Sequence, residues 1–231
     1  MNEIKIDQAA RLATGCLRAA NGINANQVTP VVSRGCIDDL IAMNFLTPSA
    51  TSGLLDATEI ERIFSRTRVL DGKDLSVLRV SIGPLKLSGP TDPVSLPTGV
   101  HPRRFSGWDF ANTKNLTPDE AQAGIAGVWP LSEESARKAE AVNAIFAPAV
   151  KGFVAGDLVC QVIGYSIDLT TRRRWFKLDA LTQLQHRYVF GSDGWWQHLW
   201  ITVPRGAVAG IEFSPQDLAM KWNNEQTPVQ H

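Results

Sequence analysis

The densest group of side chains able to hold a ligand is a short run of cations and aromatic rings. It reads Arg172-Arg173-Arg174-Trp175-Phe176-Lys177. The surrounding pattern predicts a strand over residues 172–179, whose successive side chains point to opposite faces. Cations beside an aromatic ring suit the phosphates and bases of single-stranded nucleic acid. The candidate phosphate contacts are therefore Arg172, Arg173, Arg174 and Lys177, with Trp175 as a stacking residue. An edge strand that charge protects from aggregation has the same pattern.

A second group of aromatic residues lies in a strand predicted over residues 195–203. Alternation places Trp196 and Trp200 on one face of this strand and Trp195 on the other. An exposed ring here could stack on a base or a sugar, so Trp195 and Trp196 are further candidate stacking residues. The alternative is that these rings pack in the core.

Familiar catalytic signatures are absent from the sequence. It has no His-Glu-x-x-His, no Cys-x-x-Cys and no glycine-rich phosphate loop ending in Lys-Ser or Lys-Thr. The four histidines have no spacing typical of metal ligands. We therefore predict no catalytic residue, metal site or cofactor. An enzyme of unfamiliar type stays open, with its pocket near Trp195 and Trp196.

The composition is that of a globular protein without an overall electrostatic preference. The chain has 231 residues, 23 basic and 23 acidic side chains and 44% hydrophobic residues. A net charge of zero removes any global attraction to nucleic acid or to an anionic membrane, so such binding would need a local patch. No apolar leader opens the sequence, and no apolar run approaches the ~20 residues that span a bilayer. We expect a cytoplasmic protein without a membrane partner.

The three cysteines, Cys16, Cys36 and Cys160, are an odd number at wide spacings. This spacing argues against a disulfide framework and against a zinc ribbon, which needs close pairs. We expect buried free thiols.

Residues 1–82 have the pattern of a helical unit. Apolar residues from Ala9 to Ala20 recur at helical spacing. Ser33 and Asp56 stand where they can cap two further helices, and Asn44 suits the left-handed residue that ends the second. A strand is predicted at residues 75–82.

Proline and glycine concentrate in residues 83–102, which predicts a linker to a second unit at residues 103–231. Ser132 caps a helix expected over residues 132–146, with Pro148 ending it. Strands are expected at residues 157–167, 172–179, 186–191, 195–203 and 207–213, with Ser192-Asp193-Gly194 as a hairpin turn. A short helix is expected at residues 215–222. The fold class is α+β, with a helical head and an antiparallel β barrel or curved sheet.

Part of the first unit resembles a winged helix-turn-helix domain. The stretches that carry this likeness are Gln8 to Leu12, Val32 to Leu46 and Leu55 to Ile60. Residues 4–70 are similar to the excisionase and MerR-like kind, with Asn44-Phe45-Leu46 as the turn and Thr47 to Gly53 as the wing. The resemblance implies DNA contact through Arg34. Asp38 and Asp39 on the same helix would repel phosphates, and the alternative is a three-helix interaction module.

Residues 129–213 resemble the PUA-like barrel modules, which bind modified bases or RNA.

Together these patterns predict a non-catalytic, nucleic-acid-associated protein of a phage or other mobile element. Two alternatives belong to other classes. One is an adaptor that assembles with a protein partner through its tryptophan-rich sheet. The other is a barrel that binds a small ligand, or an enzyme, near Trp195 and Trp196.

Overall fold

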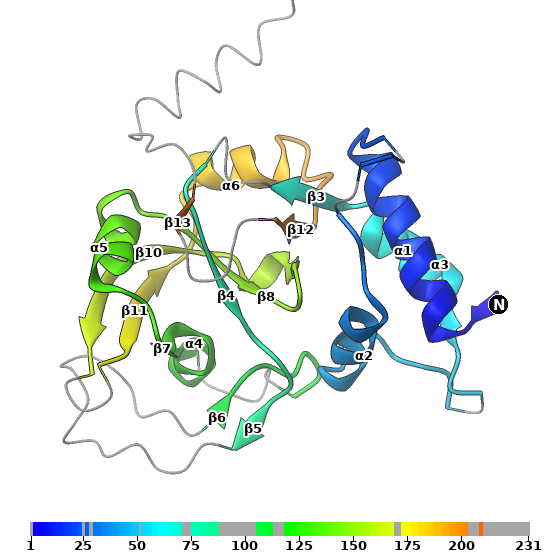
Figure 1. Cartoon of the computed structure of the whole chain (residues 1–231), viewed down its shortest axis with the longest axis horizontal. Helices are drawn as coiled ribbons and strands as arrows, with labels where there is room; N and C mark the ends of the chain where they lie inside the picture. Colours follow the sequence, from blue (N-terminus) through cyan, green and yellow to red (C-terminus); the bar gives the residue numbers. More distant parts are fainter. Residues whose placement is uncertain are drawn as a thin grey trace, which may run out of the picture.

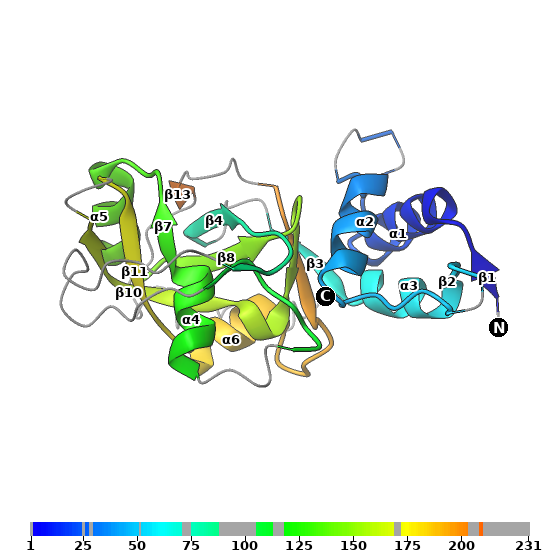
Figure 2. The same cartoon turned by 90° about the horizontal axis from the view of Figure 1, so that it is seen from below.

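Helices and sheets share the chain, as the α+β prediction requires. The computed structural model describes residues 2–24, 26–27, 30–50, 52–70, 75–87, 105–112, 118–168, 172–202 and 208–209. Three helices, α1 to α3, gather at one end of the molecule, and the sheets with the remaining helices form the rest (Figures 1 and 2).

The helical end follows the local signals of the sequence. Its helices are α1 (Ile6–Ala20), α2 (Arg34–Ala42) and α3 (Ala57–Phe64). The Ser33 side chain accepts a hydrogen bond from the Cys36 amide at 3.2 Å, and Asp56 accepts one from the Thr58 amide at 2.9 Å. Each cap satisfies an amide that has no partner inside its helix. Both predicted caps are confirmed, as is Asn44, whose φ is 55°.

The strand before α1 pairs with the strand before α3. These are β1 (Glu3–Ile4) and β2 (Leu55–Asp56), which run antiparallel. Beneath them the three helices enclose a core of fully buried side chains, among them Leu17, Ile37, Leu40, Ile60 and Phe64. This pairing ties the start of α1 to the start of α3.

Two larger sheets form the body. The first has six strands in the order β13 (Val208–Ala209), β4 (Val77–Ser81), β8 (Ile145–Ala149), β10 (Cys160–Ile167), β11 (Arg174–Asp179) and β7 (Gly127–Trp129). The second has the order β3 (Thr67–Leu70), β12 (His198–Ile201) and β9 (Phe153–Ala155). The pairs β4–β8 and β3–β12 are parallel, and the other pairs in these sheets are antiparallel. The sequence predicts an antiparallel barrel or a curved sheet, and the described strands form open sheets that do not close into a barrel.

Shorter elements complete the body. They are the ribbon β5 (Lys86–Leu87) and β6 (Phe105–Ser106), the helices α4 (Pro118–Ala126), α5 (Glu133–Ala141) and α6 (Gln183–Phe190), and the 3₁₀ helix η3 (Gly156–Leu158).

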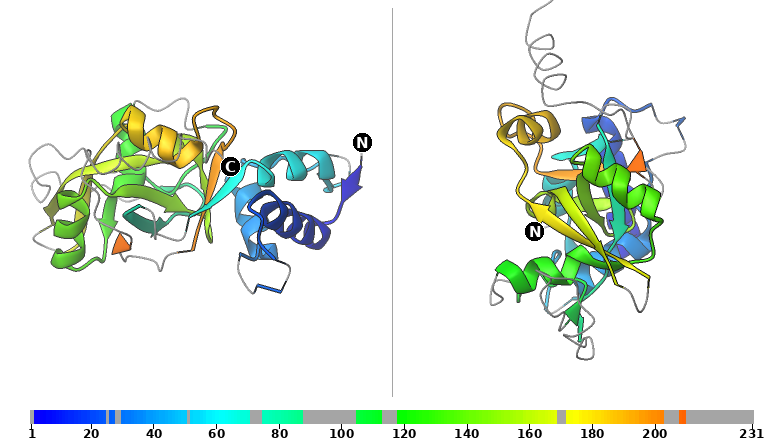
Figure 3. Two further views of the ribbon diagram at one scale, coloured as in Figure 1. Left: turned by 90° about the horizontal axis from the view of Figure 1, so that it is seen from above. Right: turned by 90° about the vertical axis from the view of Figure 1, so that its left-hand side faces the viewer.

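The sheets join the two halves of the sequence. Strands β3 and β4 come from residues 1–82, yet they hydrogen-bond to β12 and β8 of residues 103–231. A division into residues 1–82 and 103–231 therefore does not describe these sheets, because three strand pairings cross it, the third being that of β4 with β13. Most of the expected linker at residues 83–102 lies outside the described residues. Figure 3 shows β12, in orange, beside the cyan β3, between the helical end and the larger sheet.

Three local predictions in the second half are wrong. The helix that Ser132 caps ends at Ala141, because Asn143 takes a φ of 45° and Pro148 belongs to β8. Residues 186–191 are helical up to Phe190, because Thr182 and Gln185 form a capping box that starts α6. Ser192-Asp193-Gly194 consequently follows a helix and is not a hairpin turn. The helix expected at residues 215–222 lies outside the described residues.

A substitution at Gly156 tests the packing of the residue after β9 against the loop that leads into β12. A Cβ atom on Gly156 would lie 2.1 Å from the Gln197 carbonyl oxygen. We expect Gly156→Ala to lower the free energy of unfolding by roughly 1–3 kcal/mol, because backbone would have to move. In the control Gly15→Ala, nothing lies within 4 Å of the new Cβ, and helix propensity predicts a gain of about 0.5–1 kcal/mol. Urea unfolding of both variants measures the difference. Equal stabilities would contradict the packing of this junction.

Candidate functional site

The predicted basic strand does not present its cations together. Arg172 and Arg173 are exposed beside the connection between β10 and β11, and Lys177 is exposed on β11. Arg174 is only 8% exposed, and its guanidinium donates a hydrogen bond to the carbonyl of Arg172. Arg174 is therefore packed inside the body. Of the four predicted cations, Arg172, Arg173 and Lys177 are exposed on the surface.

Trp175 is buried as well, with 2% of its surface exposed. Its ring lies on Gly127 of β7, where a Cβ atom would come within 2.3 Å of Cε3. The prediction that Trp175 stacks on a base is wrong in this structure, because the ring is covered. Strict alternation fails here since the register between β11 and β7 shifts between Arg174 and Trp175, and three successive residues become buried.

Arg34 lies at the start of α2 and is surrounded by acids. Its guanidinium is 3.6 Å from a carboxylate oxygen of Asp7 and 3.6 Å from one of Asp38. Asp39 pairs instead with Lys151, at 3.1 Å. The exposed face of α2 therefore offers phosphates no unopposed cation. Moreover, α2 belongs to the helical end, whereas the β10–β11 hairpin lies on the far side of the body (Figure 2).

The three tryptophans near β12 have different environments. Trp200 is buried in the core beneath the helical end, and Trp196 packs half-buried against the cluster that contains Val189 and Leu199. Trp195 is 51% exposed. Among the described residues only Val31 matches it as an exposed large hydrophobic side chain. Of the predicted stacking residues, Trp195 alone lies open on the surface.

Trp195 forms one wall of a groove at the helical end. The groove has a volume of about 490 Å³. We call it the Trp195 groove. It is lined by Cys16, Ala19, Ala20, Glu61, Ser65 and Trp195. The small side chains of α1 leave an apolar surface opposite the indole, and α3 contributes one carboxylate and one hydroxyl.

Both the indole and the backbone of Trp195 have fixed contacts. The guanidinium of Arg66 stacks on its ring, with Cζ 5.1 Å from the ring centroid, a cation–π contact. The Trp195 amide donates a hydrogen bond to Asp193 at 3.1 Å. The amides of Gln197 and His198 both donate to the carbonyl of Arg66. The ring is therefore pre-positioned, and binding a ligand need not order it.

The groove has little means of nucleophilic chemistry. Burial, followed by the nearby carboxylate of Glu61, raises the pKa of the Cys16 thiol, so this sulfur stays protonated near neutral pH. Cys16, Cys36 and Cys160 are free thiols, as predicted, but only Cys36 is buried and the other two are partly exposed. Within the described part of the chain, Glu61 has no cationic partner that would neutralise it. The carboxylate is thus available to a ligand.

His198 lies at the start of β12, three residues after Trp195. Its ring lies 5.4 Å from Phe45 and 5.3 Å from Phe153, and Nδ1 accepts a hydrogen bond from the Gly156 amide at 3.4 Å. Burial, with a smaller contribution from Arg62, lowers the pKa of His198 to about 4. A neutral imidazole is therefore part of the junction between the helical end and the sheet.

The described residues contain no group of three histidine, cysteine, aspartate or glutamate side chains placed to hold a metal ion. None of their helices is both long and apolar enough to cross a lipid bilayer. Comparison with known proteins gives no match: no family model, no curated protein and no solved structure is significantly similar to this chain. The features of the described residues that point to a function are therefore the Trp195 groove and the exposed cations.

Sequence reasoning identified Trp195 but none of the residues around it. Ala19, Ala20 and Glu61 look like ordinary helix residues, and no local signal marks them as neighbours of a tryptophan in the second half of the chain. Only the strand pairing that joins β3 to β12 brings them together.

The burial of His198 predicts a specific loss of stability in acid. Its pKa lies below the ordinary value of 6.5, so between about pH 6.5 and pH 4 the unfolded chain binds a proton that the folded chain excludes. Stability should fall as the pH drops through this window, by at most about 1.4 kcal/mol per pH unit.

The measurement is urea unfolding across this pH range for wild type, His198→Asn and the control His186→Asn, whose histidine is exposed on α6. We expect His198→Asn to flatten the pH dependence and His186→Asn to leave it unchanged. The same slope in wild type and His198→Asn would show that another group is responsible.

Proposed function

We propose that this protein is a non-catalytic interaction protein that binds a peptide segment of a protein partner in the Trp195 groove. The observation that carries the proposal is the half-exposed indole of Trp195, fixed by Arg66 and set against the small side chains of α1. Tryptophan and arginine are the residues most enriched among those that dominate binding energy at protein interfaces.

The lining of the groove selects the chemistry of the partner. An apolar side chain can insert between Trp195 and the surface of Ala19 and Ala20, where it would leave water. The carboxylate of Glu61 lies at the same groove and favours a positively charged neighbour on the ligand. We infer a segment with a large apolar residue next to a lysine or arginine.

Replacement of Trp195 by alanine tests this function. Linear peptides would be selected from a random displayed library against the intact protein and then measured individually by fluorescence anisotropy. We expect peptides with an apolar residue beside a basic one, and we expect Trp195→Ala to weaken them at least roughly tenfold, as for a central interface residue. The matched control is Val31→Ala, which removes the other exposed large hydrophobic side chain.

Glu61→Gln separates the two parts of the recognition. It should reduce the preference for the basic residue and leave the contribution of the apolar residue intact, whereas Glu134→Gln on α5 should change neither. Selected peptides that bind Trp195→Ala as tightly as wild type would contradict the proposal.

Binding of nucleic acid is a second proposed function, because Arg172, Arg173 and Lys177 are exposed near one end of the β10–β11 hairpin. The order β1-α1-α2-β2-α3, with caps at Ser33 and Asp56, also supports the winged-helix resemblance. The neutralised Arg34 favours the hairpin over α2 as the place of contact. The PUA-like resemblance and an origin in a mobile element stay predictions.

This second function predicts a shallow dependence on salt. A site with two or three phosphate contacts should give a log–log slope of roughly −2 to −3 on duplex DNA. The double variant Arg172→Ala/Arg173→Ala should lower the magnitude of that slope by about one for each lost contact, equally for all sequences. The control Arg11→Ala/Arg137→Ala removes the same charge elsewhere. Titration of labelled oligonucleotides measures the slopes, and a wild type that does not bind at low salt excludes this function.

A further inference from the structure

A second, smaller pocket lies in the body, between the end of β4 and the ribbon β5–β6. It has a volume of about 240 Å³ and shares no residue with the Trp195 groove. This is the space of about eight water molecules at roughly 30 Å³ each. Its lining includes Ile82, Gly83, Lys86, Ser106, Gly107 and Trp129.

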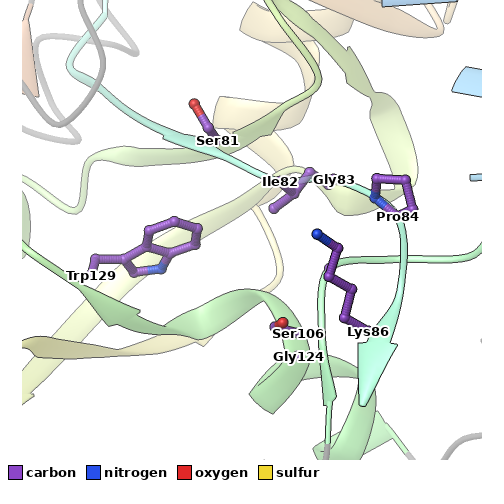
Figure 4. Close-up of a pocket in the computed structure, with 9 residues that line it drawn as sticks. Ser81, Ile82, Gly83, Pro84, Lys86, Ser106, Gly124 and Trp129 are labelled. Atoms are coloured by element: carbon purple, nitrogen blue, oxygen red, sulfur yellow. The ribbon is translucent and has the colours of Figure 1, made fainter. Parts of the chain in front are cut away.

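Lys86 and Ser106 face this pocket as a pair. They are directly opposite each other in the antiparallel ribbon, so their side chains lie on the same face. Figure 4 shows the ammonium group of Lys86 extended toward the turn at Ile82 and Gly83, with Ser106 at the lower edge. Among the described residues the Lys86 side chain has no hydrogen-bond or ion-pair partner. Its charge is available to a ligand.

The opposite wall is flat and apolar. The indole of Trp129 extends toward Lys86 from the other side of the pocket, and Ile82 lies between them (Figure 4). The Trp129 indole N–H donates to the carbonyl of Ile125 at 3.2 Å, which fixes the plane of the ring. A planar ligand can therefore stack on Trp129 while an anionic end reaches Lys86.

Backbone contacts keep the pocket open in this shape. Gly107 has a φ of 86°, and a Cβ atom there would lie 2.4 Å from the carbonyl oxygens of Gly83 and Pro84. The Trp108 amide donates a hydrogen bond to the Gly83 carbonyl at 3.0 Å. The Ile82 amide donates one to the Ala149 carbonyl at 3.1 Å. The turn and the ribbon are thus tied to each other and to β8. The pocket is built by the fold and is not a chance gap between side chains.

We propose that this pocket binds a small aromatic carboxylate, with its carboxylate at Lys86 and Ser106 and its ring on Trp129. One cation and one hydroxyl match the charge and the hydrogen-bond acceptors of a single carboxylate. The small volume limits the ligand to about one ring and a short acid chain. This proposal is independent of the Trp195 groove, and its outcome leaves the peptide-binding function unaffected.

The test uses benzoate, phenylacetate and cinnamate, each beside its neutral amide, and inorganic phosphate. Binding to the full chain is followed by the tryptophan indole signals in two-dimensional nitrogen–proton NMR spectra, with that of Trp129 assigned from a Trp129→Phe variant. We expect at least one acid to shift the Trp129 signal with saturation and to bind at least roughly tenfold more tightly than its amide, because the amide loses the charge.

Lys86→Met keeps the length of the side chain and removes its charge. We expect it to weaken the acid at least roughly tenfold and to make acid and amide bind alike. The control Lys177→Met removes an exposed cation from β11 and should leave binding unchanged. The proposal is overturned if none of the three acids shifts the Trp129 signal, if Lys86→Met binds as wild type does, or if phosphate binds as tightly as the best acid.

Discussion

The parallel pairing of β3 with β12 is the constraint on which the rest of this structure depends. Strand β3 follows α3 after only Ser65 and Arg66, and β12 follows Trp195, Trp196 and Gln197. The register His198 with Thr67 fixes how these two approaches meet. Because the carbonyl of Arg66 accepts the amides of both Gln197 and His198, the loop before β12 is held against the end of α3. Trp195 consequently stands beside α1 and α3, and the groove exists only through this pairing.

The pairing of β3 with β12 also buries the residues around it away from water. Thr67 is fully buried and gives its hydroxyl to the carbonyl of Ile63, and the ring of His198 lies among Phe45 and Phe153. A charged imidazole would have to lose its water here, which burial in a low-dielectric environment opposes. Around Thr67 and His198 the helical end and the sheets therefore meet through apolar and neutral groups. Arg66 links this junction to the groove, because its guanidinium stacks on Trp195 and its carbonyl accepts the amides of Gln197 and His198.

Local signals in the sequence predicted the local structure well. Ser33, Asp56 and Ser132 each start a helix, since a capping side chain needs only the amides two or three residues ahead. Strand geometry was less predictable. The register shift at Arg174 and Trp175 depends on β7, which is distant in the sequence, and it buried two predicted ligand contacts. Residues 186–191 have apolar side chains that fit a strand, but the capping box of Thr182 and Gln185 starts a helix. The groove escaped prediction because it combines α1, α3 and the loop before β12.

The most direct test of peptide binding in the Trp195 groove is to locate a bound peptide on the protein. A peptide selected from the library would be added to the isotope-labelled chain, and changes in the amide and indole signals would be mapped. The account predicts the largest changes at the Trp195 indole and the amides of Ala19, Ala20 and Ser65, with little change at β11. Saturable binding whose changes fall on the β10–β11 hairpin and leave the Trp195 indole unmoved would contradict it.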